Sequence, residues 1–331
     1  MGKVKFGLRV PGTPMDDSQG TVYTDQIENF LEKLDGKFDS IWISDHFFSC
    51  FWWEHPLVDT LEALTTLSYL AGRFPSYELG NNVLCNSYRN PALLAKMGAT
   101  LQTLSGGRFI LAIGAGWKED EYRAYGYDFP PFRVRVKQLE EAVQIIRKMW
   151  TEDDPSFAGE YYRIEHAHCE PRPDPVPPIM IGGVGEKYTL RLVAQHADMW
   201  NMSASDIDMF RHKLNVLKRH CDEVGRDFNE ITPAWSTEAV VIAETEAGAD
   251  RLAQQSPFSR GIPPIPPPEV DPRPFPTDPM KEGIVGTPEQ VTEGLKQFTD
   301  LGAEHFIMRF VDFPDTNMAE LFAEQVIPNF R

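Results

Sequence analysis

The segment PPIMIGGVGEKYTLRLVAQHADMWN, residues 177–201, contains one complete strand–helix–strand unit. The apolar run Pro178–Gly183 predicts a strand, and the spacing of apolar residues in Lys187–Gln195 predicts a helix. Met199–Met202 predicts the next strand. A strand that leads through a helix to another strand is typical of parallel α/β folds.

The same alternation extends in both directions along the chain of 331 residues. Its length suits one α/β barrel, a fold that runs from about 200 to over 400 residues. The predicted strands are Lys3–Val10, Ser40–Ser44, Glu78–Cys85, Arg108–Ala115, Pro178–Gly183, Met199–Met202, Ile231–Ala243 and Glu304–Phe310. The predicted helices are Thr24–Leu34, Leu57–Ala71, Pro91–Leu104, Val134–Trp150, Lys187–Gln195, Asp206–Val224 and Met318–Gln325.

Eight strands that alternate with helices predict a (β/α)8 TIM barrel with insertions, in a single domain over residues 1–331. The alternative is a doubly wound open sheet. That fold would need a GxGxxG fingerprint after the first strand, where this chain has Pro11-Gly12-Thr13-Pro14. The pattern therefore favours the barrel.

Two insertions interrupt the alternation. FAGEYYRIE, residues 157–165, predicts a short hairpin with its turn near Gly159. Residues 257–279 contain ten prolines in 23 positions, which excludes regular helix or sheet because proline lacks the backbone donor. A long loop between late barrel strands is either an active-site lid or a passive surface loop, and both interpretations stay open.

The charge balance excludes some classes of partner. The chain has 32 basic and 49 acidic residues, a net charge of −17 and a pI of about 4.9, whereas nucleic-acid binders show basic patches. Acidic surfaces also avoid anionic lipid. With no signal peptide, no apolar run of 18 residues and no CxxC pair, we expect a cytoplasmic protein that binds neither nucleic acid nor membrane.

Barrel enzymes carry their chemistry at the carboxyl ends of the strands. Asp45 and His46 follow the second predicted strand, and histidine can donate or accept a proton near neutral pH. Adjacent strand residues face opposite ways, so we expect one of the two to anchor the loop instead. An aromatic cluster comes next, which forms either a wall for a flat substrate or a patch covered by a dimer partner or by the lid. It comprises Phe47, Phe48, Phe51, Trp52 and Trp53.

Small and polar residues follow three other strands. Asn81–Asn86 contains three asparagines, which suggest either a polar ligand edge or a strained backbone. The small residues of Gly114–Trp117 either let a ligand approach the main chain or allow tight packing of a helix on the strand. Gly182–Lys187 leads directly into a helix, whose free N–H groups attract phosphate. His166, His168 and Cys169 have no second ligand cluster beside them, so we expect no metal site.

Several motifs together resemble the bacterial luciferase-like monooxygenase superfamily. They are SIWISDHF (40–47), YRNPALLAK (88–96), LSGGRFILAIGAGW (104–117) and the opening segment 177–201. The segments at 129–145, 157–165 and 217–231 look most like its coenzyme F420-dependent oxidoreductase branch.

The resemblance implies a barrel, generally homodimeric, that binds F420 or alternatively FMN at its mouth. The implied activity is hydride transfer between F420 and a small organic substrate. The alternatives are an FMN-dependent monooxygenase supplied by a separate reductase and a non-catalytic ligand-binding barrel.

The resemblance also assigns roles to residues. It implies a cis peptide at Asn82–Val83 behind the cofactor ring. Trp117 replaces the glutamate that sugar-phosphate dehydrogenases of the family have there, which argues against glucose 6-phosphate and favours a flat or apolar substrate. The predicted catalytic residues are Asp45, His46 and Trp117, and the predicted cofactor-binding residues are Asn82, Val83, Ala115, Gly116, Gly182, Gly183, Val184, Gly185 and Glu186.

Overall fold

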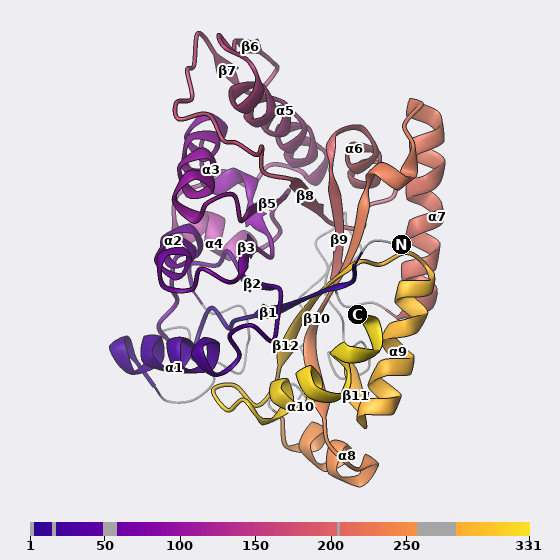
Figure 1. The fold of residues 1–331 in the computed structure, drawn as a ribbon. Helices are drawn as coiled ribbons and strands as arrows, with labels where there is room; N and C mark the ends of the chain where they lie inside the picture. The colour runs from indigo at the N-terminus through magenta and orange to yellow at the C-terminus, as the bar shows by residue number, and fades with distance from the viewer. Residues whose placement is uncertain (1–2, 15–17, 49–57, 204–205, 257–282) are drawn as a thin grey trace.

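The computed structural model describes residues 3–14, 18–48, 58–203, 206–256 and 283–331. Eight parallel strands lie side by side in a closed ring (Figure 1). In order around the ring they are β1 (Lys5–Arg9), β2 (Ser40–Ile43), β3 (Glu78–Asn81), β5 (Phe109–Gly114), β8 (Ile179–Gly182), β9 (Met199–Ser203), β10 (Thr232–Ile242) and β12 (His305–Phe310).

Two pairings close the ring. Strand β12 pairs in parallel with β1, and β10 pairs in parallel with both β9 and β12. An open doubly wound sheet would leave two edge strands, so that alternative is wrong and the (β/α)8 barrel is confirmed.

The remaining strands are short additions to this ring. Strand β4 (Leu84–Cys85) pairs with β5 beyond the end of β3, so the predicted strand Glu78–Cys85 is divided into two. Strand β11 (Ile284–Gly286) pairs with β10. Strands β6 (Phe157–Ala158) and β7 (Arg163–Ile164) pair in antiparallel fashion, which confirms the predicted hairpin.

Helices surround the strands on the outside of the ring (Figure 1). All seven predicted helices are present with shifted ends, and three others were not predicted. The predicted ones are α1 (Gly20–Lys33), α2 (Ala63–Arg73), α3 (Pro91–Ser105), α5 (Phe132–Thr151), α6 (Thr189–His196), α7 (Ile207–Val224) and α10 (Asn317–Gln325). The additional ones are α4 (Glu119–Ala124), α8 (Glu246–Gln255) and α9 (Pro288–Asp300).

The ring encloses a packed interior, as barrels of this size require. Trp42 lies at its centre, and a Cβ on either Gly7 or Gly80 would overlap the indole ring. Its Nε1 donates to Ser40 Oγ at 2.8 Å, and that hydroxyl lies 2.9 Å from His305 Nε2. The other buried apolar residues that pack together with Trp42 in the interior are Ile110, Ala112, Met180, Met199, Ala234 and Ile307.

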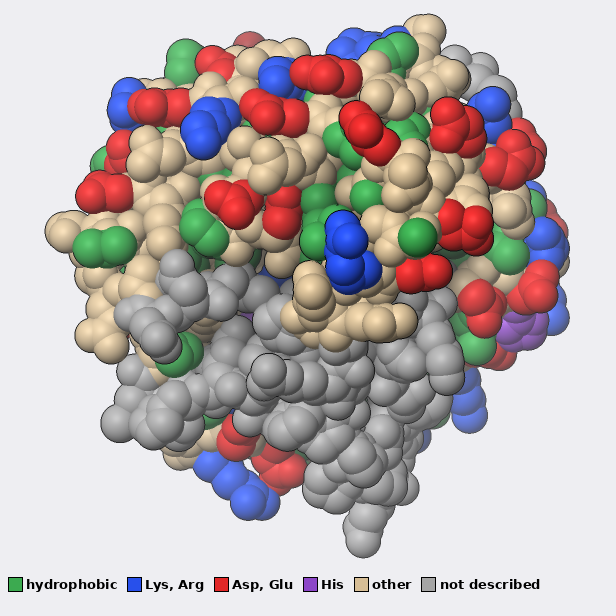
Figure 2. Space-filling model, turned by 90° about the horizontal axis from the view of Figure 1, so that it is seen from below, with side chains coloured by type: hydrophobic (Ala, Val, Ile, Leu, Met, Phe, Trp, Pro, Cys, Tyr) green, Lys and Arg blue, Asp and Glu red, His purple; other side chains and the backbone are tan. Residues whose placement is uncertain are grey.

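On the surface, acidic side chains are scattered among basic and apolar ones over the described part of the face in Figure 2. Within the described ranges, no helix is both long enough and apolar enough to cross a bilayer. The proline-rich stretch 257–279 lies outside the described residues, so its interpretation as a lid remains a prediction.

Candidate active site

Asp45, directly after β2, holds two loops of the barrel mouth together. Its Oδ2 accepts from the backbone N–H of Cys85 at 2.8 Å, and both carboxylate oxygens accept from the Arg89 guanidinium at 2.8 Å. The side chain is 1% exposed. Of the two neighbours, Asp45 is therefore the one that anchors the loop, while its predicted catalytic role is untested.

His46 faces a different set of groups. Its Nδ1 lies 3.1 Å from Oε2 of Glu121, and its ring meets Trp117 edge to face with 5.8 Å between ring centroids. The imidazole is 15% exposed. Two of the predicted catalytic residues, His46 and Trp117, are therefore in contact, and the imidazole is held on two sides.

Glu121 was not predicted. It lies on α4, its side chain is fully buried, and it accepts from the Phe47 N–H at 2.8 Å and the Tyr88 hydroxyl at 2.9 Å. Burial acts to raise the pKa of Glu121, but the hydrogen bond and charge of His46 and the charge of Lys118 outweigh it and lower the pKa. In the sequence KEDEY nothing distinguishes this glutamate from its acidic neighbours.

The aromatic cluster after β2 is present in part. The ring of Phe47 stacks on Tyr125 with centroids 4.1 Å apart and lies 4.4 Å from the ring of Tyr88. Lys118 Nζ lies 3.7 Å from the centre of the Phe48 ring. The tyrosines were not predicted as members, and the predicted Phe51, Trp52 and Trp53 lie outside the described residues.

The Asn82–Val83 peptide is cis, as expected. A Cβ on Gly114 or on Gly182 would lie 2.9 Å from a methyl group of Val83, so these two glycines at the ends of β5 and β8 make room for it. Asn82 Oδ1 accepts from Asn201 Nδ2 at 2.9 Å. Just beyond β3, Val83 therefore makes apolar contacts with β5 and β8, and Asn82 makes a polar contact with β9.

Ala115 and Gly116 lie against α4. Gly116 has a φ of 75°, and a Cβ there would overlap the Tyr122 hydroxyl. That hydroxyl lies 3.4 Å from the carbonyl oxygen of Ala115 and 3.0 Å from Cys85 Sγ. The close approach of α4 therefore explains the glycine, and a role of these residues in cofactor binding remains a prediction.

The backbone N–H groups of the segment Gly182–Glu186 differ in their hydrogen bonding. Gly183 N–H donates to the carbonyl of Asn201 at 3.2 Å, whereas the N–H groups of Val184, Gly185 and Glu186 have no acceptor in the part of the chain that the structure describes. The Glu186 carboxylate binds His212 at 2.9 Å and Lys213 at 2.7 Å. Only the main chain of Glu186 is therefore available to an anion.

A buried ion cluster that sequence reasoning missed lies where β1, β10 and β12 run side by side. Arg9 donates to Glu238 and, at 2.9 Å, to Ser44 Oγ, and Arg309 Nη1 lies 3.6 Å from Glu238. Burial acts to raise the pKa of Glu238, but the charges of Arg9 and Arg309 lower it. The residue types alone do not reveal this cluster, because its members are far apart in the chain.

Residues 5–305 match the sequence profile that describes luciferase-like monooxygenases. The chain belongs to this family.

Named relatives of this luciferase-like chain include a dehydrogenase. The "F420-dependent glucose-6-phosphate dehydrogenase" of Amycolatopsis mediterranei (strain U-32) is 26% identical over 339 residues, covering 93% of this chain and 94% of that one. A solved F420-dependent secondary alcohol dehydrogenase in complex with an F420–acetone adduct has a TM-score of 0.80 at 23% identity, over the full length of both chains. Monooxygenase RslO1 from Streptomyces bottropensis has a TM-score of 0.78 at 19% identity, covering 99% and 100%. At these identities the structural likeness shows the fold.

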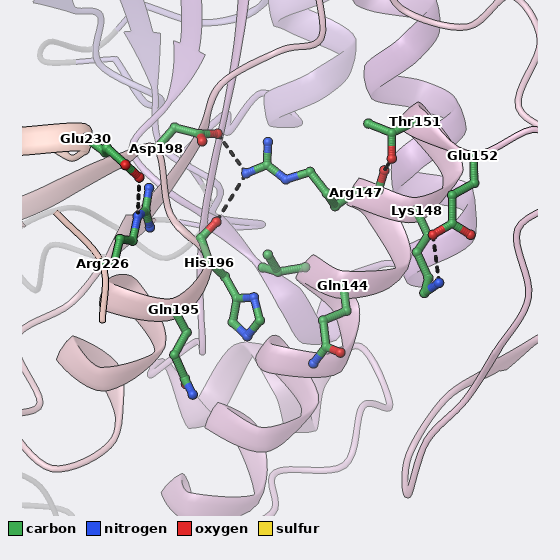
Figure 3. A pocket seen from close by; sticks show the side chains of 11 residues that line it. Gln144, Arg147, Lys148, Thr151, Glu152, Gln195, His196, Asp198, Arg226 and Glu230 are labelled. Atoms are coloured by element: carbon green, nitrogen blue, oxygen red, sulfur yellow. Dashed lines mark hydrogen bonds and ion pairs between the residues drawn. The ribbon is translucent and has the colours of Figure 1, made fainter. Parts of the chain in front are cut away.

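The luciferase-like barrel also has a cleft of about 480 Å³ at its opposite end (Figure 3). Asp198 lines it and directly precedes β9, so the cleft lies at the amino ends of the strands. Arg147 pairs with Asp198 at 2.8 Å and Arg226 pairs with Glu230 at 3.1 Å. Since these guanidinium groups are paired and barrel chemistry occurs at the other end, we assign the cleft no part in the site.

Both histidines of the connection after the hairpin, His166 and His168, have partners within the chain. His166 Nδ1 lies 2.8 Å from the Asp154 carboxylate, and His168 Nδ1 lies 3.1 Å from the Asp153 carbonyl. Cys169 is buried. Over the described ranges, no group of three or more His, Cys, Asp or Glu side chains could hold a metal ion.

Proposed function

We propose that this protein is a coenzyme F420-dependent oxidoreductase that transfers a hydride between the deazaflavin and a small organic substrate. The observation that carries the proposal is His46, held at the carboxyl end of β2 by Glu121 and Trp117. The names of the dehydrogenase relatives support the choice of cofactor.

The residues at the mouth fit such a cofactor. The N–H groups of Val184, Gly185 and Glu186, which have no acceptor among the described residues, precede α6, an arrangement that suits a phosphate group. Asn201 Oδ1 is buried without a hydrogen-bond partner among the described residues, and it suits an N–H at the edge of a pyrimidine ring. Val83 would support the face of the ring. Because the whole chain carries a charge of −17, backbone donors would have to attract an anionic cofactor.

When bound, F420 would supply the hydride donor or acceptor, and the protein would supply position and electrostatics. His46 would exchange a proton with the substrate at Nε2, the ring nitrogen opposite Glu121. Trp117 would hold the imidazole plane and border the substrate. We therefore propose a flat or apolar alcohol or carbonyl compound as substrate, in preference to a sugar phosphate.

The first test compares F420, FMN and FAD by fluorescence titration and then measures hydride transfer with a panel of alcohols and ketones. We expect F420 to bind most tightly. His46→Gln should keep cofactor affinity and slow hydride transfer by about 10²- to 10⁴-fold, the usual contribution of a general acid or base. His168→Gln, on the exposed hairpin connection, is the matched control and should leave the rate unchanged. Tight binding of FMN with no response to F420 would refute the proposal.

A second candidate is an FMN-dependent monooxygenase that receives reduced flavin from a separate reductase. The aromatic wall of Phe47, Tyr88 and Tyr125 favours it, because such a reaction needs a dry pocket. Oxygen consumption with reduced FMN and a long-chain aldehyde or ketone would support this function. No turnover with either cofactor would support a non-catalytic barrel.

We also propose a cytoplasmic homodimer without nucleic-acid or membrane partners. Exposed apolar side chains on neighbouring helices support the dimer, namely Tyr69 on α2 and Leu93 and Leu104 on α3. Light scattering on the purified protein should give about twice the chain mass of 37.6 kDa.

A further inference from the structure

The Glu121 carboxylate is the meeting point of three segments at the barrel mouth. From the loop after β2 it accepts the Phe47 N–H at 2.8 Å and the Phe48 N–H at 3.4 Å, both on Oε1. On Oε2 it meets the Tyr88 hydroxyl at 2.9 Å and His46 Nδ1 at 3.1 Å. The side chain has no solvent exposure, so these protein groups replace its hydration shell.

This arrangement determines which nitrogen of His46 carries the proton. A carboxylate can only accept, so Nδ1 must be the protonated nitrogen for the contact to be a hydrogen bond. Lys118 Nζ, 4.0 Å from Oε1, favours the ionised carboxylate. The lone pair of neutral His46 is therefore on Nε2, on the opposite side of the ring.

We propose that Glu121 is a positioning residue that fixes His46 as the Nδ1–H tautomer and restricts its proton exchange with substrate to Nε2. The catalytic half of this inference rests on the proposed function, whereas the tautomer half does not. Carboxylates that orient metal-bound histidines through the other ring nitrogen act in the same way, and their loss commonly costs about 10- to 100-fold in activity or affinity.

Neighbouring acids do not have this role. Asp45 is engaged by Arg89 and by the Cys85 N–H. Asp120 and Glu119, on the same turn of α4, are 63% and 46% exposed and bind Lys118 and Arg123. In the described part of the chain, Glu121 is the acid in contact with the His46 ring.

The substitution Glu121→Gln makes the proposal sharply testable. Backbone N–H groups can only donate, so the new amide oxygen should replace Oε1 and stay bonded to Phe47 and Phe48. The amide NH2 would then replace Oε2 and donate to His46 Nδ1. We therefore expect this variant to invert the tautomer, placing the proton of neutral His46 on Nε2.

Nitrogen-15 NMR of the histidine rings in the full chain, without added cofactor, measures the tautomer directly. His46→Gln identifies the His46 signals among the eight histidines. We expect Nδ1–H in the parent, Nε2–H in Glu121→Gln, and Nδ1–H in two controls. Glu121→Asp keeps the charge, and Tyr88→Phe removes another hydrogen bond to the same carboxylate. An Nε2–H parent, or a Glu121→Gln variant that keeps the parental tautomer, would overturn the proposal.

Single-turnover hydride transfer with F420 tests the catalytic half. We expect Glu121→Gln to slow transfer about 10- to 100-fold while the F420 dissociation constant changes less than twofold, and Glu121→Asp to recover part of the rate. An inverted tautomer with an unchanged rate would overturn the catalytic half. If the parent itself transfers no hydride, the proposed function fails while the NMR result still decides the tautomer.

Discussion

Asp45 and His46 are adjacent in the chain but have different partners. Consecutive side chains at a strand end point to opposite sides, so Asp45 meets Arg89 and His46 meets Glu121. The sequence predicted that one of the two would anchor the loop. Asp45 is that residue because Arg89, 44 residues further along the chain, lies beside it.

The barrel interior depends on single glycines in a similar way. We expect Gly80→Ala to lower the free energy of unfolding by about 1–3 kcal/mol, because its methyl group would overlap the Trp42 ring in a closed space. Urea denaturation followed by Trp fluorescence measures this. Gly72→Ala is the control, since that glycine lies on α2 with nothing within 4 Å of the added carbon. It should be neutral or stabilising by up to about 1 kcal/mol. Equal stabilities of the two variants would contradict the overlap.

At the scale of elements, the sequence predicted seven helices and missed α4, α8 and α9. Helix α4 has six residues, too few for an apolar period to be recognised. It nevertheless carries Glu121 and packs Tyr122 against Gly116. Helix α4, which the sequence did not predict, therefore carries Glu121, the functional residue that it also did not predict. The role of Glu121 follows from the position of α4 beside the loop after β2.

Helix α9 has a start signal that is independent of packing. Thr287 Oγ1 accepts from the Gln290 N–H, Gln290 Oε1 accepts from the Thr287 N–H, and Pro288 occupies the first turn. We expect Thr287→Ala to lower the free energy of unfolding by about 1 kcal/mol, because it removes this capping box. Chemical denaturation tests it, with Thr299→Ala near the end of the same helix as the control. A cost of Thr299→Ala equal to that of Thr287→Ala would refute the capping explanation.

At the scale of the whole molecule, closure of the ring buries His305 between β1 and β10. Burial, with a smaller contribution from the charge of Lys5, lowers its pKa to about 3. Unfolded histidine takes up a proton below about pH 6.5, whereas the folded side chain stays neutral until about pH 3. The unfolded state thus binds more protons in this window, and stability falls as the pH falls.

We therefore expect His305→Gln to flatten the fall in stability between pH 6.5 and 5, by up to about 1.4 kcal/mol per pH unit. Unfolding free energies measured at a series of pH values test this, with His168→Gln as the exposed control. Asp312 acts in the opposite direction, because burial raises its pKa to about 6 and its stabilising protonation increases as the pH falls through that value. An unchanged slope in His305→Gln would show that His305 is not the group responsible.

Local sequence patterns predicted the barrel, seven of its helices, the short hairpin and the positions of Asp45, His46 and Trp117 at strand ends. These follow from local periodicity and from the rule that parallel strands end on one side of the barrel. Its motifs also led to the family.

Which side chains come into contact was visible only in the folded chain. The pairing of Asp45 with Arg89, the contact of Glu121 with His46 and the cluster of Arg9, Glu238 and Arg309 join residues that are 44 or more positions apart. Such contacts depend on how strands and loops are brought together around the ring. The periodicity of a single segment carries no information about that arrangement.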